Sequence, residues 1–149
     1  MKTEPFVSWS SKYDTGFAHI DEQHKLLVRV INEFYDGLQN RQADRAVVFK
    51  RAAHQAVEYV KNHFAAEEKW MRDTGFPGYQ KHCAEHALFA QQLLGCVKRF
   101  DRNDSRPAFE FVKFLAGWLM SHIAVEDNNF RFHLKPHQTP PPSAAAPKA

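Results

Sequence analysis

Apolar residues recur at intervals of three and four positions in four stretches of this chain, at about residues 21–39, 43–73, 79–102 and from 107 onward. This spacing is typical of amphipathic helices, because it puts the apolar side chains on one face. No stretch shows the alternation expected of a strand. The apolar faces comprise Leu27, Val28, Ile31, Phe34, Tyr35 and Leu38; Ala52, Ala56, Tyr59, Val60, Phe64, Trp70 and Met71; Phe89, Leu93, Val97 and Phe100; and Phe111, Leu115 and Trp118.

The residues between these stretches predict where the helices begin and end. Asp21 is expected to cap the first helix. Gly75 suits the left-handed position at the end of the second helix, and Pro77 prevents its continuation. Pro107 is tolerated in the first turn of the fourth helix. Because the connections are short, the sequence predicts an all-α fold, an antiparallel up-down-up-down four-helix bundle spanning residues 21–134.

The two ends of the chain differ from the bundle. Residues 1–20 lack helical periodicity but carry Trp9, Tyr13 and Phe17, so we expect an N-terminal arm that packs across the helices. Residues 135–149 form a Pro/Ala-rich segment that is expected to be a disordered tail.

Composition narrows the class of protein. The 149 residues suit one domain, and the hydrophobic and charged fractions, 44% and 25%, are ordinary for a soluble protein. The net charge of +3 is spread out, so no nucleic-acid partner is expected. The chain start lacks the apolar run of a signal peptide, and no segment approaches the length of a membrane span. Cys83 and Cys96 cannot bridge each other, so we expect reduced thiols in a cytoplasmic protein.

Polar side chains interrupt the apolar face of the second helix. His63 and Glu67 are four residues apart, so both leave the helix on the same face. A single pair of this kind is usually a structural ion pair or a hydrogen-bonded histidine. A buried carboxylate nevertheless needs a compensating charge or metal.

The other three helices carry similar groups on their apolar faces. Five histidines and two carboxylates are therefore predicted to enter one core, where each ring nitrogen needs a partner. Metal coordination between facing helices would satisfy all of them. The candidate ligands are His24, His63, Glu67, His82, His86, His122 and Asp127.

The type of donor limits the choice of metal. Structural zinc takes four ligands, usually including cysteine, so seven candidates exceed one zinc site. Mixed imidazole and carboxylate donors suit iron, among other transition metals. A ferritin-like di-iron site would need Glu-x-x-His on two helices, and no glutamate here is followed by a histidine three residues later.

The ordered set of motifs resembles the hemerythrin family, specifically its single-domain bacterial members. The motifs are a lone His24 after Ile-Asp-Glu-Gln, then HxxxE, HxxxH and HxxxxD, over about residues 7–133. The resemblance implies a non-haem di-iron centre that binds dioxygen reversibly. It implies one iron on three histidines, a second iron on two, and two carboxylates that bridge them together with an oxo or hydroxo group. By position these are His82, His86 and His122; His24 and His63; and Glu67 and Asp127.

Counting donors under this resemblance places the reactive position. If each iron prefers six donors, the iron on three histidines is complete and the iron on His24 and His63 keeps one position open for dioxygen. Leu27, Phe64, Trp118 and Ile123 lie one to four residues from these ligands and are candidates for an apolar oxygen pocket.

Three functions remain open at this point. The first is dioxygen binding for storage, delivery or buffering, which the apolar pocket favours. The second is a di-iron enzyme that reduces peroxide, dioxygen or nitric oxide, which would need protons delivered to the site. The third is an oxygen or iron sensor that acts through a separate protein partner, whose identity the sequence does not give.

Overall fold

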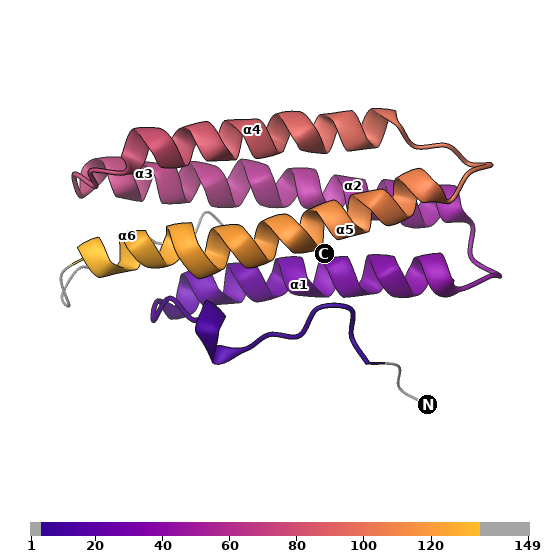
Figure 1. Cartoon of the computed structure of the whole chain (residues 1–149), viewed down its shortest axis with the longest axis horizontal. Helices are drawn as coiled ribbons and strands as arrows, with labels where there is room; N and C mark the ends of the chain where they lie inside the picture. The colour runs from indigo at the N-terminus through magenta and orange to yellow at the C-terminus, as the bar shows by residue number, and fades with distance from the viewer. Residues whose placement is uncertain (1–3, 135–149) are drawn as a thin grey trace.

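Four antiparallel helical rods make up the protein, and Figure 1 shows them side by side along their length. The computed structural model describes residues 4–134. The rods are α1 (Ala18–Gln39), then α2 (Arg45–Tyr59) continuing through η2 (Val60–Phe64) into α3 (Ala65–Asp73), then α4 (Tyr79–Lys98), and finally α5 (Arg106–Ser121) continuing through η3 (His122–Asp127) into α6 (Asn128–His133). The predicted up-down-up-down bundle is therefore confirmed, and no named strand occurs within residues 4–134.

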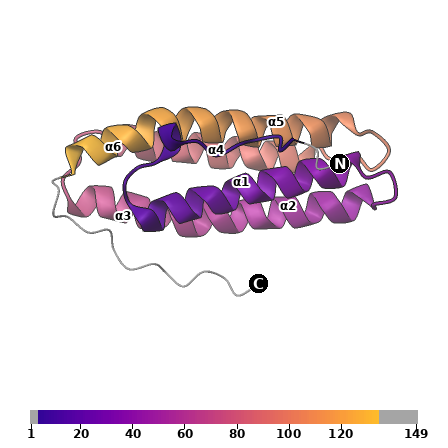
Figure 2. The ribbon, with the colours of Figure 1, turned by 90° about the horizontal axis from the view of Figure 1, so that it is seen from below.

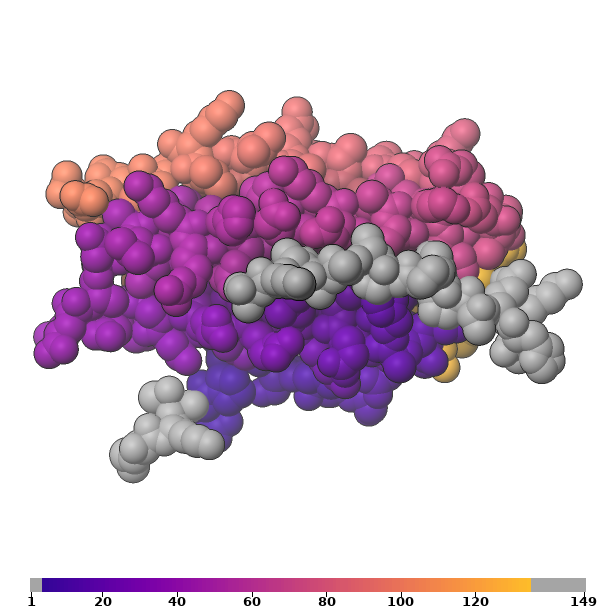
Figure 3. All heavy atoms as spheres, turned by 180° about the vertical axis from the view of Figure 1, so that it is seen from behind, coloured from indigo at the N-terminus to yellow at the C-terminus, as the bar shows by residue number. Residues whose placement is uncertain are grey.

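Each rod packs against its neighbours in sequence, and the last rod closes the bundle against the first. Figure 3 shows one outer face of this arrangement, where the atoms of α1 and of α2–η2–α3 meet along the rods. Two of the three rods after α1 contain a π-helical segment, η2 and η3. The segment η2 contains His63, and η3 contains His122.

The ends of the helices follow most of the turn signals. Gly75 has a φ of +68°, the left-handed conformation predicted after α3. Pro107 lies in the first turn of α5, as predicted. The third helix ends at Lys98, not near Arg102, and Phe100 stacks on Phe49 from the loop, with ring centroids 4.2 Å apart.

The start of α1 corrects the sequence prediction. The helix begins at Ala18, three residues before Asp21, so Asp21 lies inside the first turn and does not cap it. Its buried carboxylate instead accepts hydrogen bonds from the backbone N and the Oγ1 of Thr15, at 2.8 and 2.7 Å. Asp21 therefore fastens the arm to the helix, a role that the spacing of apolar residues does not reveal.

The arm, described here from residue 4, runs alongside α1 toward the start of that helix (Figure 2). Val7 and Tyr13 are buried, and the side chain of Asn32 on α1 makes two hydrogen bonds with the backbone of Val7. A short 3₁₀ turn, Ser11–Tyr13, brings the arm to the bundle. The arm thus packs along α1, while the predicted tail 135–149 lies outside the described residues.

Two apolar clusters fill the bundle on either side of the histidines. The larger one includes Phe34, Phe49 and Phe111, whose rings meet at centroid distances of 5.3 to 6.0 Å. The smaller one packs Ile20, Trp70, Met71, Phe130 and Leu134 at the end of the bundle where α1 begins. The polar residues are therefore enclosed between two apolar layers that limit water access.

The last rod corrects a further prediction. Within the described residues, Arg106–His133 is long and apolar enough, by length and composition, to cross a membrane. The expectation that no segment approaches this length is wrong for this helix. The helices that form the core of a bundle meet the same criteria, and this one carries the buried His122 and Asp127. The absence of a membrane partner stays a prediction.

Candidate metal centre

The structure brings all seven candidate ligands together in the middle of the bundle. They come from all four rods, and each is at most 5% exposed. They form two groups whose donor atoms lie within 4.8 Å of one another and could hold a metal ion. The first group is Glu67, His82, His86 and His122, and the second is His24, His63 and Asp127.

The first group gathers three imidazole nitrogens. Nε2 of His122 lies 3.1 Å from Nε2 of His86 and 3.1 Å from Nε2 of His82. Oε2 of Glu67 lies 3.2 Å from the Nε2 atoms of His82 and His86. His82 and His86 share one face of α4 because they are four residues apart, and Glu67 and His122 face them from α3 and η3.

The second group gathers two imidazoles and one carboxylate. Nε2 of His24 lies 3.2 Å from Nε2 of His63 and 3.1 Å from Oδ2 of Asp127. Nε2 of His63 also lies 3.8 Å from Oε2 of Glu67. The two groups are therefore adjacent, and Glu67 and Asp127 each approach imidazoles of both groups.

Asp127 faces both groups with different oxygens. Oδ1 lies 3.1 Å from Nε2 of His122 and 3.3 Å from Nε2 of His82, while Oδ2 points to His24. On a regular α-helix, residues five apart lie on different faces. The π-helical segment His122–Asp127 widens this turn and brings both side chains to the same face. Glu126, the better aligned residue on an α-helix, is instead directed outward to Lys81.

A second π-helical segment, Val60–Phe64, was not predicted. His63 and Phe64 are consecutive, yet they are only 3% and 5% exposed. Because a π turn holds one more residue than an α turn, it lets both side chains enter the core. The segment therefore supplies a candidate ligand and an apolar wall from adjacent positions.

Outer contacts determine which nitrogens face the site. Nδ1 of His63 is hydrogen-bonded to Oε1 of Gln23. An amide oxygen can only accept, so Nδ1 carries the proton and the Nε2 lone pair faces inward. Nδ1 of His86 donates in the same way to Oε1 of Glu68, at 2.8 Å. Such contacts orient histidines that bind metals.

The electrostatics of the site require positive charge. Burial lowers the pKa of His63 to about 3, so its ring is neutral. Burial also disfavours the charged form of His82, but hydrogen bonds and charge from Asp127 and Glu67 outweigh it and raise the pKa of His82 to about 10. A proton on His82 thus offsets part of the charge of two buried carboxylates, a role that a cation fills more completely.

The donor set fits a metal ion on two observations. Buried atoms without a hydrogen-bond partner are concentrated here: Nδ1 of His24 and His82, Oε1 of Glu67, and both carboxylate oxygens of Asp127. Around an octahedral ion with bonds of about 2.1 Å, neighbouring donors lie about 3.0 Å apart, close to the 3.1 to 3.3 Å spacings found here. Nitrogen and carboxylate donors together suit a first-row transition metal.

The four predicted pocket residues line different parts of the site. Phe64 stacks on His86, with ring centroids 3.6 Å apart, and Trp118 stacks on His122 at 4.3 Å. These two rings therefore lie against the group of three histidines. Leu27, one turn after His24, and Ile123 are each 1% exposed. The pocket as a place for oxygen stays a prediction.

The remaining polar neighbours were missed or only partly foreseen. His54 and His133 are exposed, and His137 lies outside the described residues. His19 belongs to α1, where its Nε2 lies 3.2 Å from Nε2 of Gln23. The direct contact between Oε1 of Glu68 and Nδ1 of His86 was not predicted. The contact of Gln23 with His63 was also missed. Its position four residues after His19 and directly before His24 is the sequence feature that could have indicated a place beside the site.

Tyr59 was read only as a core residue. Its ring stacks on His63, with centroids 4.9 Å apart and an interplanar angle of 18°. Burial, followed by the charges of Asp127 and Glu67, raises the pKa of its hydroxyl well above the ordinary value. The phenol therefore keeps its proton beside the group of two histidines.

Comparison with known proteins agrees with this arrangement. The sequence pattern of the Hemerythrin HHE cation binding domain matches residues 15–131, which contain all seven candidate ligands. Proteins named bacteriohemerythrin are similar over most of the chain. That of Pseudomonas aeruginosa strain PAO1 is 30% identical over 122 residues, covering 82% of this chain and 77% of the relative.

More distant relatives extend the same similarity. The bacteriohemerythrin of Clostridium acetobutylicum is 24% identical over 124 residues, covering 82% of this chain and 96% of the relative. That of Methylococcus capsulatus is 25% identical over 122 residues, covering 81% of this chain and 91% of the relative. With a helical bundle that encloses the ordered set of histidines and carboxylates, and with a family match over most of its length, this chain belongs to the hemerythrin family of cation-binding domains.

Proposed function

We propose that the protein binds dioxygen reversibly at a centre of two iron ions. The observation that carries this proposal is the placement of Asp127, whose two oxygens face two separate groups of imidazole nitrogens. One carboxylate between two groups of donors is the arrangement expected of a bridging ligand. Glu67 supports it, since its Oε2 approaches both His82 and His63.

The seven candidate ligands would be divided between two ion positions. His82, His86 and His122 would hold one ion, and His24 and His63 the other, with Glu67 and Asp127 shared between them. When bound, two ferrous ions supply the electrons that make dioxygen binding possible. Because the second position has two histidines instead of three, it retains room for an exogenous ligand.

The surroundings favour binding over turnover. Turnover of a reduced oxygen species needs protons, whereas reversible binding needs a dry site. The apolar clusters on both sides of the centre exclude water, and Leu27 lies on the same face of α1 as His24. Tyr59 carries a hydroxyl that could donate a proton beside His63, but its raised pKa makes it a poor acid.

The decisive experiment combines metal analysis with visible spectroscopy. The purified protein is expected to hold two irons per chain and to show an oxygen-dependent band that disappears on anaerobic reduction and returns in air. A single zinc per chain after growth in iron-replete medium would contradict the iron assignment. Irreversible bleaching with consumption of peroxide would support an enzyme instead.

Leu27 offers a test of the apolar wall. Replacing Leu27 by Gln introduces a polar group of similar length beside His24, so spontaneous oxidation of the oxygenated protein should become faster while the iron content stays the same. Leu27→Met, which keeps the site apolar, should behave as the wild type. Equal oxidation rates in Leu27→Gln, Leu27→Met and the wild type would show that this wall does not protect the bound state.

Tyr59 separates binding from enzyme activity. Tyr59→Phe removes the hydroxyl and keeps the ring that stacks on His63. For a carrier, the oxygen-dependent band and the rate of spontaneous oxidation should both be retained. Slower consumption of peroxide in this variant than in the wild type would assign the phenol a part in turnover and would favour the enzyme.

A further inference from the structure

The candidate ligands are at most 5% exposed, so a cation needs a route from solvent to reach them. Three partly exposed glutamates lie on the outer side of the group of three histidines. The side chains of Glu68, Glu85 and Glu126 are 30%, 29% and 21% exposed. Oε1 of Glu68 accepts a hydrogen bond from Nδ1 of His86 at 2.8 Å, and Oε2 of Glu85 lies farther from Nδ1 of His122, at 3.7 Å. Glu126 lies against Lys81.

Glu85 and Glu126 form a third group of potential donors together with His82. One carboxylate oxygen of each glutamate and one ring nitrogen of His82 lie within 4.8 Å of one another. Nε2 of His82 faces the inner ligands, which leaves Nδ1 as the second potential donor of this ring. That Nδ1 is buried and has no hydrogen-bond partner. His82 therefore has an unpartnered ring nitrogen and belongs to the same group of potential donors as two partly exposed carboxylates.

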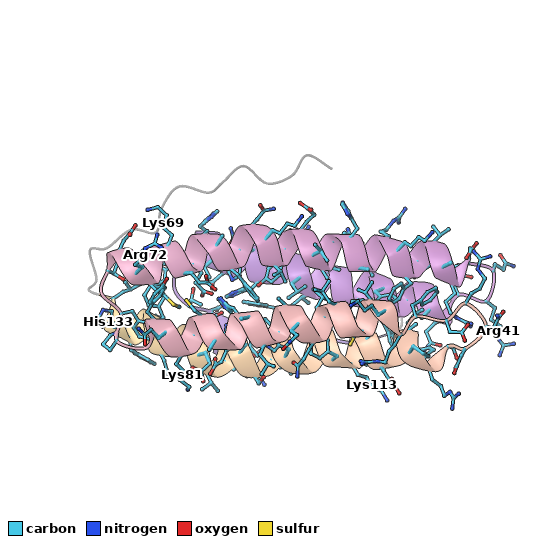
Figure 4. The ribbon with its side chains drawn as sticks, turned by 90° about the horizontal axis from the view of Figure 1, so that it is seen from above. Arg41, Lys69, Arg72, Lys81, Lys113 and His133 are labelled. Carbon is cyan, nitrogen blue, oxygen red and sulfur yellow. The ribbon has the colours of Figure 1, made fainter. Side chains whose placement is uncertain are left out.

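Lys81 covers the pair from the solvent side. Its Nζ lies 3.4 Å from Oε1 of Glu126 and 3.5 Å from Oε1 of Glu85. The lysine side chain is 70% exposed, and Figure 4 shows it projecting from the outside of α4. An exposed ion pair of this kind contributes little stability, so the ammonium is easily displaced.

We propose that Glu85, Glu126 and His82 form a loading site where a divalent transition-metal cation binds before it reaches the inner ligands. Two carboxylates attract the cation and replace part of its hydration, and the cation displaces the ammonium of Lys81. The proton that His82 carries in the metal-free protein leaves to solvent when the imidazole binds the cation. His82 belongs to both sites, so it connects the outer position to the inner one. The inference depends on cation binding by the seven inner residues and not on dioxygen binding.

A different role for the two glutamates makes a different prediction. If Glu85 and Glu126 only orient the histidines through water, their loss changes the equilibrium affinity of the inner site. A loading site instead lowers the barrier to passage, so its loss slows loading and release by similar factors and leaves affinity nearly unchanged. Rates in both directions therefore distinguish the two roles.

The experiment follows the uptake of Co²⁺, whose visible absorption reports imidazole and carboxylate coordination, by the metal-free full-length protein in a stopped-flow instrument. Glu126→Gln should slow uptake by about threefold or more, since one carboxylate is lost close to the path of a doubly charged ion. Lys81→Gln should speed uptake, because the competing ammonium is gone. Opposite effects from neighbouring charges cannot come from a general loss of stability.

The chain contains a matched control pair. Glu58 and Lys61 form an exposed ion pair at 3.8 Å, with side chains 33% and 68% exposed. They lie on α2 and η2, not on the helical segments that carry Lys81, Glu85 and Glu126. Glu58→Gln and Lys61→Gln make the same charge changes and should leave the rate of uptake within the error of the wild type. If these controls change the rate as much as the test variants do, net charge explains the effect and the proposal fails.

Release from the loaded protein provides the second measurement. With an excess of chelator, Co²⁺ should leave Glu126→Gln more slowly and Lys81→Gln faster, by factors close to those of uptake. This direction starts from the loaded protein and does not depend on the metal-free state. Unchanged rates in both directions, or a change in affinity with unchanged uptake, would overturn the loading site. A wild-type chain that takes up no Co²⁺ at the inner residues would count against the proposed metal centre itself.

Discussion

Gln23 gives the sharpest test of how the second group of ligands is held. Its Oε1 accepts the proton of Nδ1 of His63, and this ring is 3% exposed. Replacing Gln23 by Leu keeps a side chain of similar volume but removes the acceptor. Nδ1–H of His63 would then remain buried without a partner, and the imidazole would lose the contact that turns Nε2 toward the site.

The expected magnitude follows from two independent estimates. Leaving a buried donor unsatisfied costs about 1–3 kcal/mol. Removing an outer partner of a metal-binding histidine typically costs about 10–100-fold in metal affinity, which corresponds to about 1.4–2.7 kcal/mol. The two ranges overlap, so Gln23→Leu should weaken the more easily removed metal by about one to two orders of magnitude.

The assay is competition of the loaded protein against a graded series of chelator concentrations, with metal per chain measured at each point. In Gln23→Leu, the first metal should leave at a correspondingly lower chelator concentration than in the wild type. The group of three histidines has its own outer contact from Glu68 to His86, so metal held there should be lost later.

Two further variants test whether the effect comes from the hydrogen bond to His63 or from any change near residue 23. Gln23→Glu keeps an acceptor for His63 and should stay close to the wild type. His19→Ala removes only the contact with Nε2 of Gln23, on the partly exposed side, and should have a small effect. Wild-type affinity in Gln23→Leu, or an equal loss in Gln23→Glu, would refute the assignment of this hydrogen bond.

Two other predictions concern the removal of single carboxylates and its effect on metal content or on stability. Asp127→Ala should remove most of the bound metal, whereas Glu126→Ala should retain it at equilibrium, because only Asp127 faces both groups of imidazoles; metal analysis of the purified variants checks this. Asp21→Ala should lower the free energy of unfolding by about 1–3 kcal/mol in denaturant titration, since it leaves the buried N–H and hydroxyl of Thr15 unsatisfied, while the metal content should be unchanged.

Much of the fold could be predicted because each helix has one apolar face. The spacing along Leu27, Ile31 and Phe34 describes a single face of α1, and all three residues are buried. Six of the seven candidate ligands were found by the same rule, as polar residues at core positions, whereas the choice of Asp127 rested on the HxxxxD motif of the hemerythrin resemblance. Periodicity detects such residues reliably, because burying a charge without a partner is unfavourable.

Contacts that depend on side-chain direction could not be predicted in this way. Asp21 was expected to cap a helix, but the hydrogen bonds from Thr15 draw it back to the arm and the helix begins earlier. Glu68 and Gln23 are polar residues at partly buried positions, which look like ordinary solvated residues in a sequence. Their role appears only when His86 and His63 arrive from other rods.

The two π-helical segments show where sequence spacing is sufficient and where it is not. In η3, the five-residue interval from His122 to Asp127 does not fit an α-helix, so the interval itself required a wider turn. In η2, the four-residue interval from His63 to Glu67 fits an α-helix, and nothing in it signals a change. The need for the second π segment arises from Phe64, which must enter the core beside His63 in order to stack on His86. That requirement comes from a residue on a different rod, so it exists only in the assembled bundle. The geometry of this centre is therefore encoded partly in the positions of its ligands and partly in the packing that presses those ligands together.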